Sequence, residues 1–130
     1  MSYTNGLDDP SAYFQTVLYV GNATARSITF DGNTDMQPDL NWTKVRNSGT
    51  YHNLADSVRG ATKQIYSNVS DAEASATDAI TSFNSNGFSI GSNGDVNANT
   101  KNIVSWNWKA GTSFTNDASA TGVGTIDSTG

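Results

Sequence analysis

Turn signals recur so closely along this chain that only short elements fit between them. Asn86-Gly87 and Asn93-Gly94 are two such signals, and both supply residues that accept the positive φ angles of tight hairpins. Between the signals, apolar and polar residues alternate with the period of two that half-buried strands show. Short strands spaced roughly ten residues apart predict an all-β fold, an antiparallel β-sandwich or jelly roll.

Six to eight strands are expected, and one of them is clearer than the others. In segment 102–108, Val104, Trp106 and Trp108 face one way, while Ser105 and Asn107 face the other. An apolar stripe of this kind is typical of a face that packs into a core. The other strands are expected at 13–20, 27–30, 40–45, 62–69, 80–83 and 87–91, and segment 51–57 is less regular.

Composition explains why helices are expected to be scarce. Ser, Thr, Asn and Gly number 16, 16, 15 and 12, which is 59 of the 130 residues. The first three compete for backbone hydrogen bonds, and glycine loses too much entropy in a helix. A helical bundle and a coiled coil are therefore excluded. Ser70 and Glu73 match a capping box, so at most one short helix is expected, near 70–76.

A chain of 130 residues fits one domain. We expect the sandwich to span 13–111, with its 13 aromatic rings (five Phe, five Tyr and three Trp) supplying much of the core. Residues 1–12 are expected to form an N-terminal arm. Residues 112–130 are mostly Gly, Thr, Ser and Ala, which predicts a flexible C-terminal segment or one that a partner orders.

The charge pattern narrows the range of partners. Twelve acidic and seven basic residues give a formal charge of −5, and the basic residues are scattered rather than clustered. Nucleic acid and acidic membranes are therefore not expected as partners. The chain has no cysteine, which excludes disulfides and thiolate chemistry. Its first residues do not resemble a signal peptide, so synthesis in the cytoplasm is expected.

The residues offer little for catalysis. His52 is the only histidine, and Asp56 and Ser57 are the residues that would complete a Ser/His/Asp set with it. Those two are sequence neighbours that point to opposite faces of a strand, and no nucleophile-elbow motif is present. No catalytic residue and no cofactor are therefore assigned, and the chain is expected not to be an enzyme.

One loop partly matches a calcium-binding pattern. Asp31, Asn33 and Asp35 place oxygen ligands at alternate positions, as a calcium loop does. The sixth position is Met36 rather than glycine, and the twelfth is Trp42 rather than glutamate. The alternative interpretation is a turn rich in Asp and Asn, held by its own side chains.

The tryptophans admit two interpretations. Trp42, Trp106 and Trp108 could form an aromatic platform that binds a sugar, or they could belong to the core. The second is the more usual role of a pair spaced by two residues on an alternating strand.

A turn after segment 51–57 carries the most distinctive short run. Arg59 could bind a ligand, but the spacing favours a structural role in which Asp56 and Arg59 pair and fix the turn before Gly60. These three residues are therefore predicted to be structural.

Seven segments, taken in order, resemble a known family. They read YFQTVLY at 13–19, QPDLNWTK at 37–44, HNLADSVRG at 52–60, SN at 67–68, DAEA at 71–74, FNSNGFSIG at 83–91 and VSWNWKAG at 104–111. This order is similar to the domain found, often repeated, in large virion structural proteins of tailed bacteriophages. The family commonly reads W-I-K-N-R where this chain has Trp42-Thr43-Lys44-Val45-Arg46, a departure that bears on loop specificity more than on the fold.

The resemblance implies a concanavalin-A-like β-sandwich and a place in the virion, as a tail-fibre or capsid-surface appendage module that takes part in host attachment. The implied partners are other virion proteins and further copies of the chain, with a trimer as the expected oligomer because fibre proteins form symmetric assemblies. The alternative function is a lectin-like domain that binds carbohydrate on the host surface.

Overall fold

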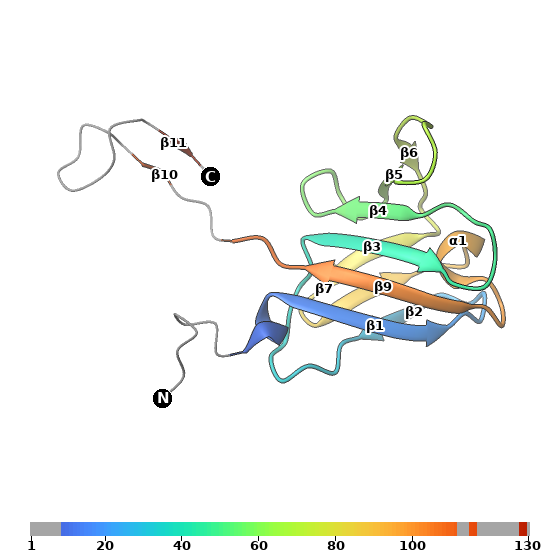
Figure 1. Ribbon diagram of the computed structural model, residues 1–130, viewed down its shortest axis with the longest axis horizontal. Helices are drawn as coiled ribbons and strands as arrows, with labels where there is room; N and C mark the ends of the chain where they lie inside the picture. Colours follow the sequence, from blue (N-terminus) through green and yellow to red (C-terminus); the bar gives the residue numbers. More distant parts are fainter. Residues whose placement is uncertain (1–8, 112–114, 117–127, 130) are drawn as a thin grey trace.

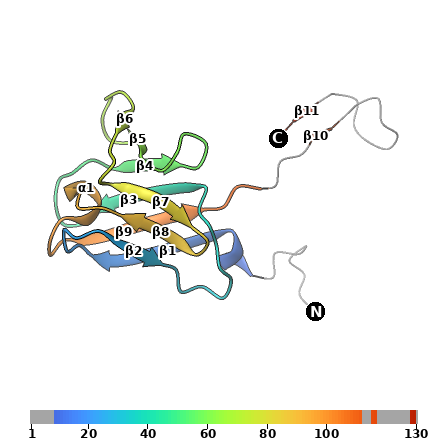
Figure 2. The same ribbon diagram turned by 180° about the vertical axis from the view of Figure 1, so that it is seen from behind.

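Backbone pairing arranges the strands of the main body into two antiparallel sheets (Figures 1 and 2). The computed structural model describes residues 9–111, 115–116 and 128–129. The larger sheet has six strands in the order β1-β9-β3-β4-β5-β6, and the smaller has three in the order β2-β8-β7. The bounds are β1 Phe14–Val20, β2 Arg26–Thr29, β3 Leu40–Val45, β4 Asn53–Asp56, β5 Lys63–Tyr66, β6 Ala74–Ser75, β7 Ile80–Asn84, β8 Gly87–Ile90 and β9 Asn102–Trp108. The predicted all-β antiparallel sandwich is confirmed.

The two ends of the chain are described only in part. Of the arm predicted at 1–12, the structure describes the last four residues, which include a 3-10 helix at Pro10–Ala12. The side chain of Ser11 accepts a hydrogen bond from the Thr34 N–H at 3.1 Å, so this part is fastened to the loop before β3. Of the segment predicted at 112–130, only β10 (Thr115–Asn116) and β11 (Ser128–Thr129), which pair with each other, lie within the described residues.

The short helix does not lie where the capping box predicts it. Ser70 and Glu73 belong to an extended loop, and the chain then forms β6, in which Ala74 pairs with Gln64 of β5. A helix of one or two turns has too few hydrogen bonds to offset the cost of its nucleation. Pairing with an existing strand therefore prevails over the local signal.

The α-helical turn of the described chain is α1, at Gly94–Asn97. Asn93 caps it, because the Asn93 side chain accepts a hydrogen bond from the Asp95 N–H at 2.9 Å. The turn is also anchored from within, since Val96 and Asn97 are fully buried. The helix thus depends on tertiary burial and an asparagine cap rather than on sequence propensity.

The apolar core lies between the two sheets and draws mainly on the smaller sheet and its loops. Phe30 and Phe88 pack with ring centroids 6.1 Å apart, so phenyl rings do form part of the core as expected. From the larger sheet, Val17 and Tyr19 pack against this cluster. The buried members of the core are Ile28, Phe30, Met36, Ala55, Ala79, Ile80, Phe88, Ile90 and Val96.

The tryptophans are not part of this core, so the interpretation of them as core residues is wrong. Val17 faces the core and pairs with Ser105 of β9, and directly paired residues share a face. Ser105 therefore faces inward, and Trp106, the next residue, faces outward. An alternating strand has two distinct faces, but the pattern alone does not say which of them is covered.

Part of the inward face of the larger sheet is polar, and its side chains on β3 and β9 hydrogen-bond to one another. Asn41 donates to Ser105 Oγ at 2.8 Å and to Asn107 Oδ1 at 2.7 Å. Thr43 in turn donates to Asn41 Oδ1 at 2.7 Å. All four residues have no measurable exposure. Pairing of this kind offsets the cost of burying polar groups, and these four residues are paired with one another across β3 and β9.

Candidate functional site

The outward face of the larger sheet collects most of the large apolar side chains that the core does not use. We call this surface the aromatic face, and Figure 1 shows β1, β9, β3 and β4 with no other described element in front of them. Phe14 lies 5.1 Å from Trp108, and Trp42 lies 5.2 Å from Trp106, between ring centroids. Strand register places on this face Phe14, Leu18, Val20, Leu40, Trp42, Leu54, Ile65, Val104, Trp106 and Trp108.

The edge strand β1 is the most open part of the aromatic face. Leu18 is 62% exposed, Val20 is 55% exposed and Phe14 is 41% exposed. The outward face of the smaller sheet is different, because Ser27 and Ser89 contact each other there through their hydroxyl oxygens at 3.1 Å. The outward face of the larger sheet is therefore the more apolar of the two, although Thr16 and Lys44 also lie on it.

A cavity of about 310 Å³ adjoins the aromatic face, where Leu40 and Trp108 meet the exposed Val58. Its two carboxylates are engaged by the chain itself. Asp39 accepts hydrogen bonds from the Ser57 hydroxyl and from the Ala110 N–H, both at 2.8 Å. This cavity is therefore an apolar extension of the aromatic face rather than a polar binding site.

The turn between β4 and β5 has the geometry that the spacing predicts. Asp56 forms a salt bridge with Arg59 and also accepts hydrogen bonds from the N–H groups of Val58 at 3.1 Å and Arg59 at 2.8 Å. Gly60 follows with a φ of +99°, a conformation that favours glycine. Burial opposes ionisation, but the hydrogen bonds and charge of Arg59 and the Val58 N–H outweigh it and lower the pKa of the Asp56 carboxyl.

This lowered pKa makes the turn sensitive to acid. When folding lowers the pKa of a carboxyl group, its ionised form stabilises the folded state. This stabilisation is complete above the pKa of the unfolded state and is lost as the pH falls through the pKa of the folded state. We expect the free energy of unfolding of the Asp56→Asn variant to fall less steeply with pH than that of the wild type, below about pH 4. Urea titrations at a series of pH values measure this free energy. If it depended on pH in the same way in the two proteins, the prediction would be contradicted.

The loop with the calcium-like pattern is exposed throughout. Asp31, Asn33 and Asp35 all lie on its surface, and its Gly32 N–H donates to the Gln15 side chain at 3.0 Å. Within the described ranges, no group of three or more His, Cys, Asp or Glu residues is placed to hold a metal ion.

His52 lies on the loop before β4, and its N–H donates to Asn68 Oδ1 at 2.8 Å. Asp56 and Ser57 stand at the opposite end of that strand, roughly 13 Å along it at strand spacing, so the structure does not bring the three together. Burial and the nearby Lys44 lower the pKa of the imidazole.

No helix in the described part of the chain is long and apolar enough to span a membrane.

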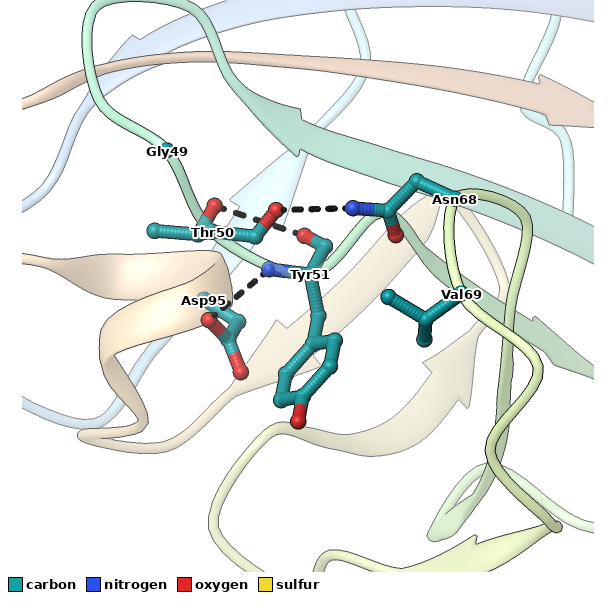
Figure 3. Close-up of a pocket in the computed structure, with 6 residues that line it drawn as sticks. All are labelled: Gly49, Thr50, Tyr51, Asn68, Val69 and Asp95. Carbon is teal, nitrogen blue, oxygen red and sulfur yellow. Dashed lines mark hydrogen bonds between the residues drawn. The ribbon is translucent and has the colours of Figure 1, made fainter.

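A second cavity, of about 450 Å³, is built from three separate segments (Figure 3). Tyr51 comes from the loop between β3 and β4, Asn68 and Val69 from the loop after β5, and Asp95 from the first turn of α1. The Tyr51 N–H donates to Asp95 Oδ1 at 3.3 Å. We call this cavity the Tyr51 pocket.

Negative charge gathers around two tyrosine rings at the Tyr51 pocket. Tyr51 and Tyr66 stack with centroids 4.4 Å apart and an interplanar angle of 30°. Interaction with the nearby Asp71 carboxylate raises the pKa of the Tyr51 hydroxyl. Burial raises the pKa of Asp95, and the charge of Asp78 adds to the effect.

Sequence reasoning missed the Tyr51 pocket. Tyr51 and Asp95 are 44 positions apart, and no motif connects them. The one local signal was the irregular segment 51–57, where strand alternation breaks just before β4 begins.

The fold and these two surfaces define a β-sandwich domain whose larger sheet turns an aromatic side outward and a polar side inward. The chain belongs to the family described as Domain of unknown function (DUF7483), whose model matches residues 9–130. No curated protein and no solved structure matches the chain.

Proposed function

We propose that the chain is a structural, non-enzymatic module of a bacteriophage virion, in a tail-fibre or capsid-surface appendage that takes part in host attachment. Copies of the chain associate through the aromatic face, and other virion proteins are their neighbours. The single observation that carries the proposal is this exposed face, with Leu18 62% and Val20 55% accessible. The virion assignment is supported by the resemblance that segments between residues 13 and 111 have to domains of phage virion proteins.

The size of the aromatic face fits an assembly surface. Five neighbouring strands about 4.8 Å apart, each up to about seven residues long, outline roughly 20 Å by 20 Å. This outline limits the apolar patch to at most about 400 Å² on one chain, a size at which the largest patch of a protein is often functional. Bringing two such faces together removes the rings from water, which is the main favourable term in association.

The contrast between the two outer faces supports a specific interface rather than general stickiness. On the smaller sheet, the Ser27 and Ser89 hydroxyls lie together, and Asn84 donates to Ser89 Oγ at 3.0 Å. A single face that packs on itself forms a two-fold dimer. The trimer expected from the resemblance would need this face to contact a second, different surface.

The mass of the chain in solution tests self-association. Light scattering of the 130-residue protein should give a multiple of 13.7 kDa. Leu18→Asp should reduce the mass to that of one chain, because a carboxylate would then be buried against indole and aliphatic groups. Ser27→Asp is the matched control, since it places the same residue in an exposed strand position on the other sheet, and it should keep the oligomer.

Two results would overturn the proposal. A wild-type chain that stays monomeric, or an oligomer that survives Leu18→Asp, removes the aromatic face as the interface. Absence of the chain from purified particles of the phage that encodes it, measured by mass spectrometry, removes the virion assignment.

A further inference from the structure

We infer that the Tyr51 pocket is a saccharide-binding site, in which the apolar face of a pyranose ring packs against Tyr51 and a hydroxyl of the sugar donates to Asp95. This site lies apart from the aromatic face and would operate whether or not copies of the chain associate. It goes beyond the proposed assembly role by naming a ligand and the residues that hold it.

The apolar part of the Tyr51 pocket is a rigid aromatic platform. Tyr51 is 39% exposed, while its ring rests on Tyr66 at a centroid distance of 4.4 Å. Figure 3 shows Val69 on one side of the Tyr51 ring and the Asp95 carboxylate on the other. The C–H face of a pyranose gains by covering such a ring, and a ring already held by a neighbour loses little side-chain freedom on binding.

The polar groups left free at the pocket are hydrogen-bond acceptors. Asp95 Oδ1 accepts from the Tyr51 N–H, and no hydrogen bond from the described residues reaches the other carboxylate oxygen. The Asn68 side chain is engaged at both ends, by the His52 N–H at 2.8 Å and by the Thr50 carbonyl at 3.3 Å. A ligand must therefore bring donors, and an ionised carboxylate binds hydroxyl donors strongly.

The same acceptors would attract an amine, but the geometry favours a neutral ligand. Among the residues that line the pocket, Asp95 carries the one carboxylate, and it already accepts a hydrogen bond from the Tyr51 N–H. In the part of the chain that the structure describes, acidic groups do not converge in threes on a point where a cation could sit. A volume of about 450 Å³ suits a one- or two-ring sugar.

Saturation-transfer NMR on the full chain tests the site with a panel of methyl pyranosides: gluco, galacto, manno and N-acetylglucosamine. Each is used at about 10 mM, since a small ligand that buries little surface binds weakly. At least one of these sugars should bind. In spectra of the protein, its addition should shift the amide signals of Tyr51, Val69 and Asp95. Tyr51→Ala should weaken that binding at least about tenfold and Asp95→Asn about threefold or more.

The matched control separates the Tyr51 pocket from tyrosine exposure alone. Tyr13→Ala removes another exposed tyrosine (46%) and should leave saccharide binding unchanged. Melting curves establish whether each variant folds. If Tyr51→Ala does not fold, the binding of Asp95→Asn tests the inference. Three outcomes would overturn the inference: no pyranoside binds, Tyr51→Ala and Asp95→Asn both bind as the wild type does, or only spermidine binds, with an affinity that falls as salt rises.

Discussion

Gly87→Ala is expected to destabilise the protein by about 4 kcal/mol, a large share of the total free energy of unfolding of a domain of this size. Gly87 begins β8, the central strand of the smaller sheet, with a φ of +116°. A Cβ added there would stand 2.0 Å from the carbonyl oxygen of Ile28 on the neighbouring strand. The substitution therefore combines backbone strain, about 1–3 kcal/mol, with a forced displacement of β2.

Two other glycines separate these causes. Gly60 also has a positive φ, of +99°, but a Cβ there would meet nothing within 4 Å, so Gly60→Ala should cost only the strain, about 1–2 kcal/mol. Gly49 has open space and no positive φ, so Gly49→Ala should be neutral or slightly stabilising. Urea denaturation followed by circular dichroism measures all three. Equal costs at Gly87 and Gly60 would show that the approach to Ile28 is not tight.

The strands could be predicted from the sequence because their signals are local. β3 matches the predicted bounds 40–45 and β9 matches 102–108, since alternation and flanking turn residues lie within the segments themselves. The helix near 70–76 failed for the opposite reason. Its capping box is also a local signal, but the pairing of Ala74 with Gln64 depends on a strand ten positions away.

Which side of the larger sheet faces the core could not be predicted from a single strand. Trp106 and Ser105 alternate in β9, and burial of the apolar side is the ordinary expectation. The polar side is inward here because Ser105 and Asn107 meet Asn41 and Thr43 on β3, residues more than 60 positions away. Only the register of β3 on β9 reveals that these side chains satisfy one another.

The candidate surfaces follow from this arrangement. Trp42, Trp106 and Trp108 were predicted as a set, and strand register does gather them on one face, together with β1. The Tyr51 pocket, in contrast, is assembled from loops, and nothing in the spacing of Tyr51, Asn68 and Asp95 signals that they meet.

Asn41→Ala is expected to lower the free energy of unfolding by about 3 kcal/mol. Asn41 is fully buried and takes part in three side-chain hydrogen bonds, donating to Ser105 and Asn107 and accepting from Thr43. Its removal leaves partners unpaired, at about 1–3 kcal/mol each when none finds a substitute, and opens a small cavity. Part of the loss is recovered, because Thr43 can still donate to Ser105 Oγ at 3.0 Å.

Asn102→Ala is the matched control for this prediction. Asn102 begins β9 in the same sheet, but its side chain is exposed, and the substitution should change stability by less than about 0.5 kcal/mol. A double-mutant cycle adds a sharper readout. Asn41 and Asn107 are hydrogen-bonded at 2.7 Å, so the double alanine variant should cost at least about 1 kcal/mol less than the sum of the single ones.

The cycle also tests the sidedness of the larger sheet, on which the aromatic face depends. If Asn41 faced water and the tryptophans faced the core, Asn41→Ala would be as harmless as Asn102→Ala and the coupling to Asn107 would be close to zero. A loss of about 3 kcal/mol together with strong coupling requires a dry, mutually bonded polar layer. Since residues on a strand alternate, such a layer on the inner side leaves the indoles of β3 and β9 on the outer one.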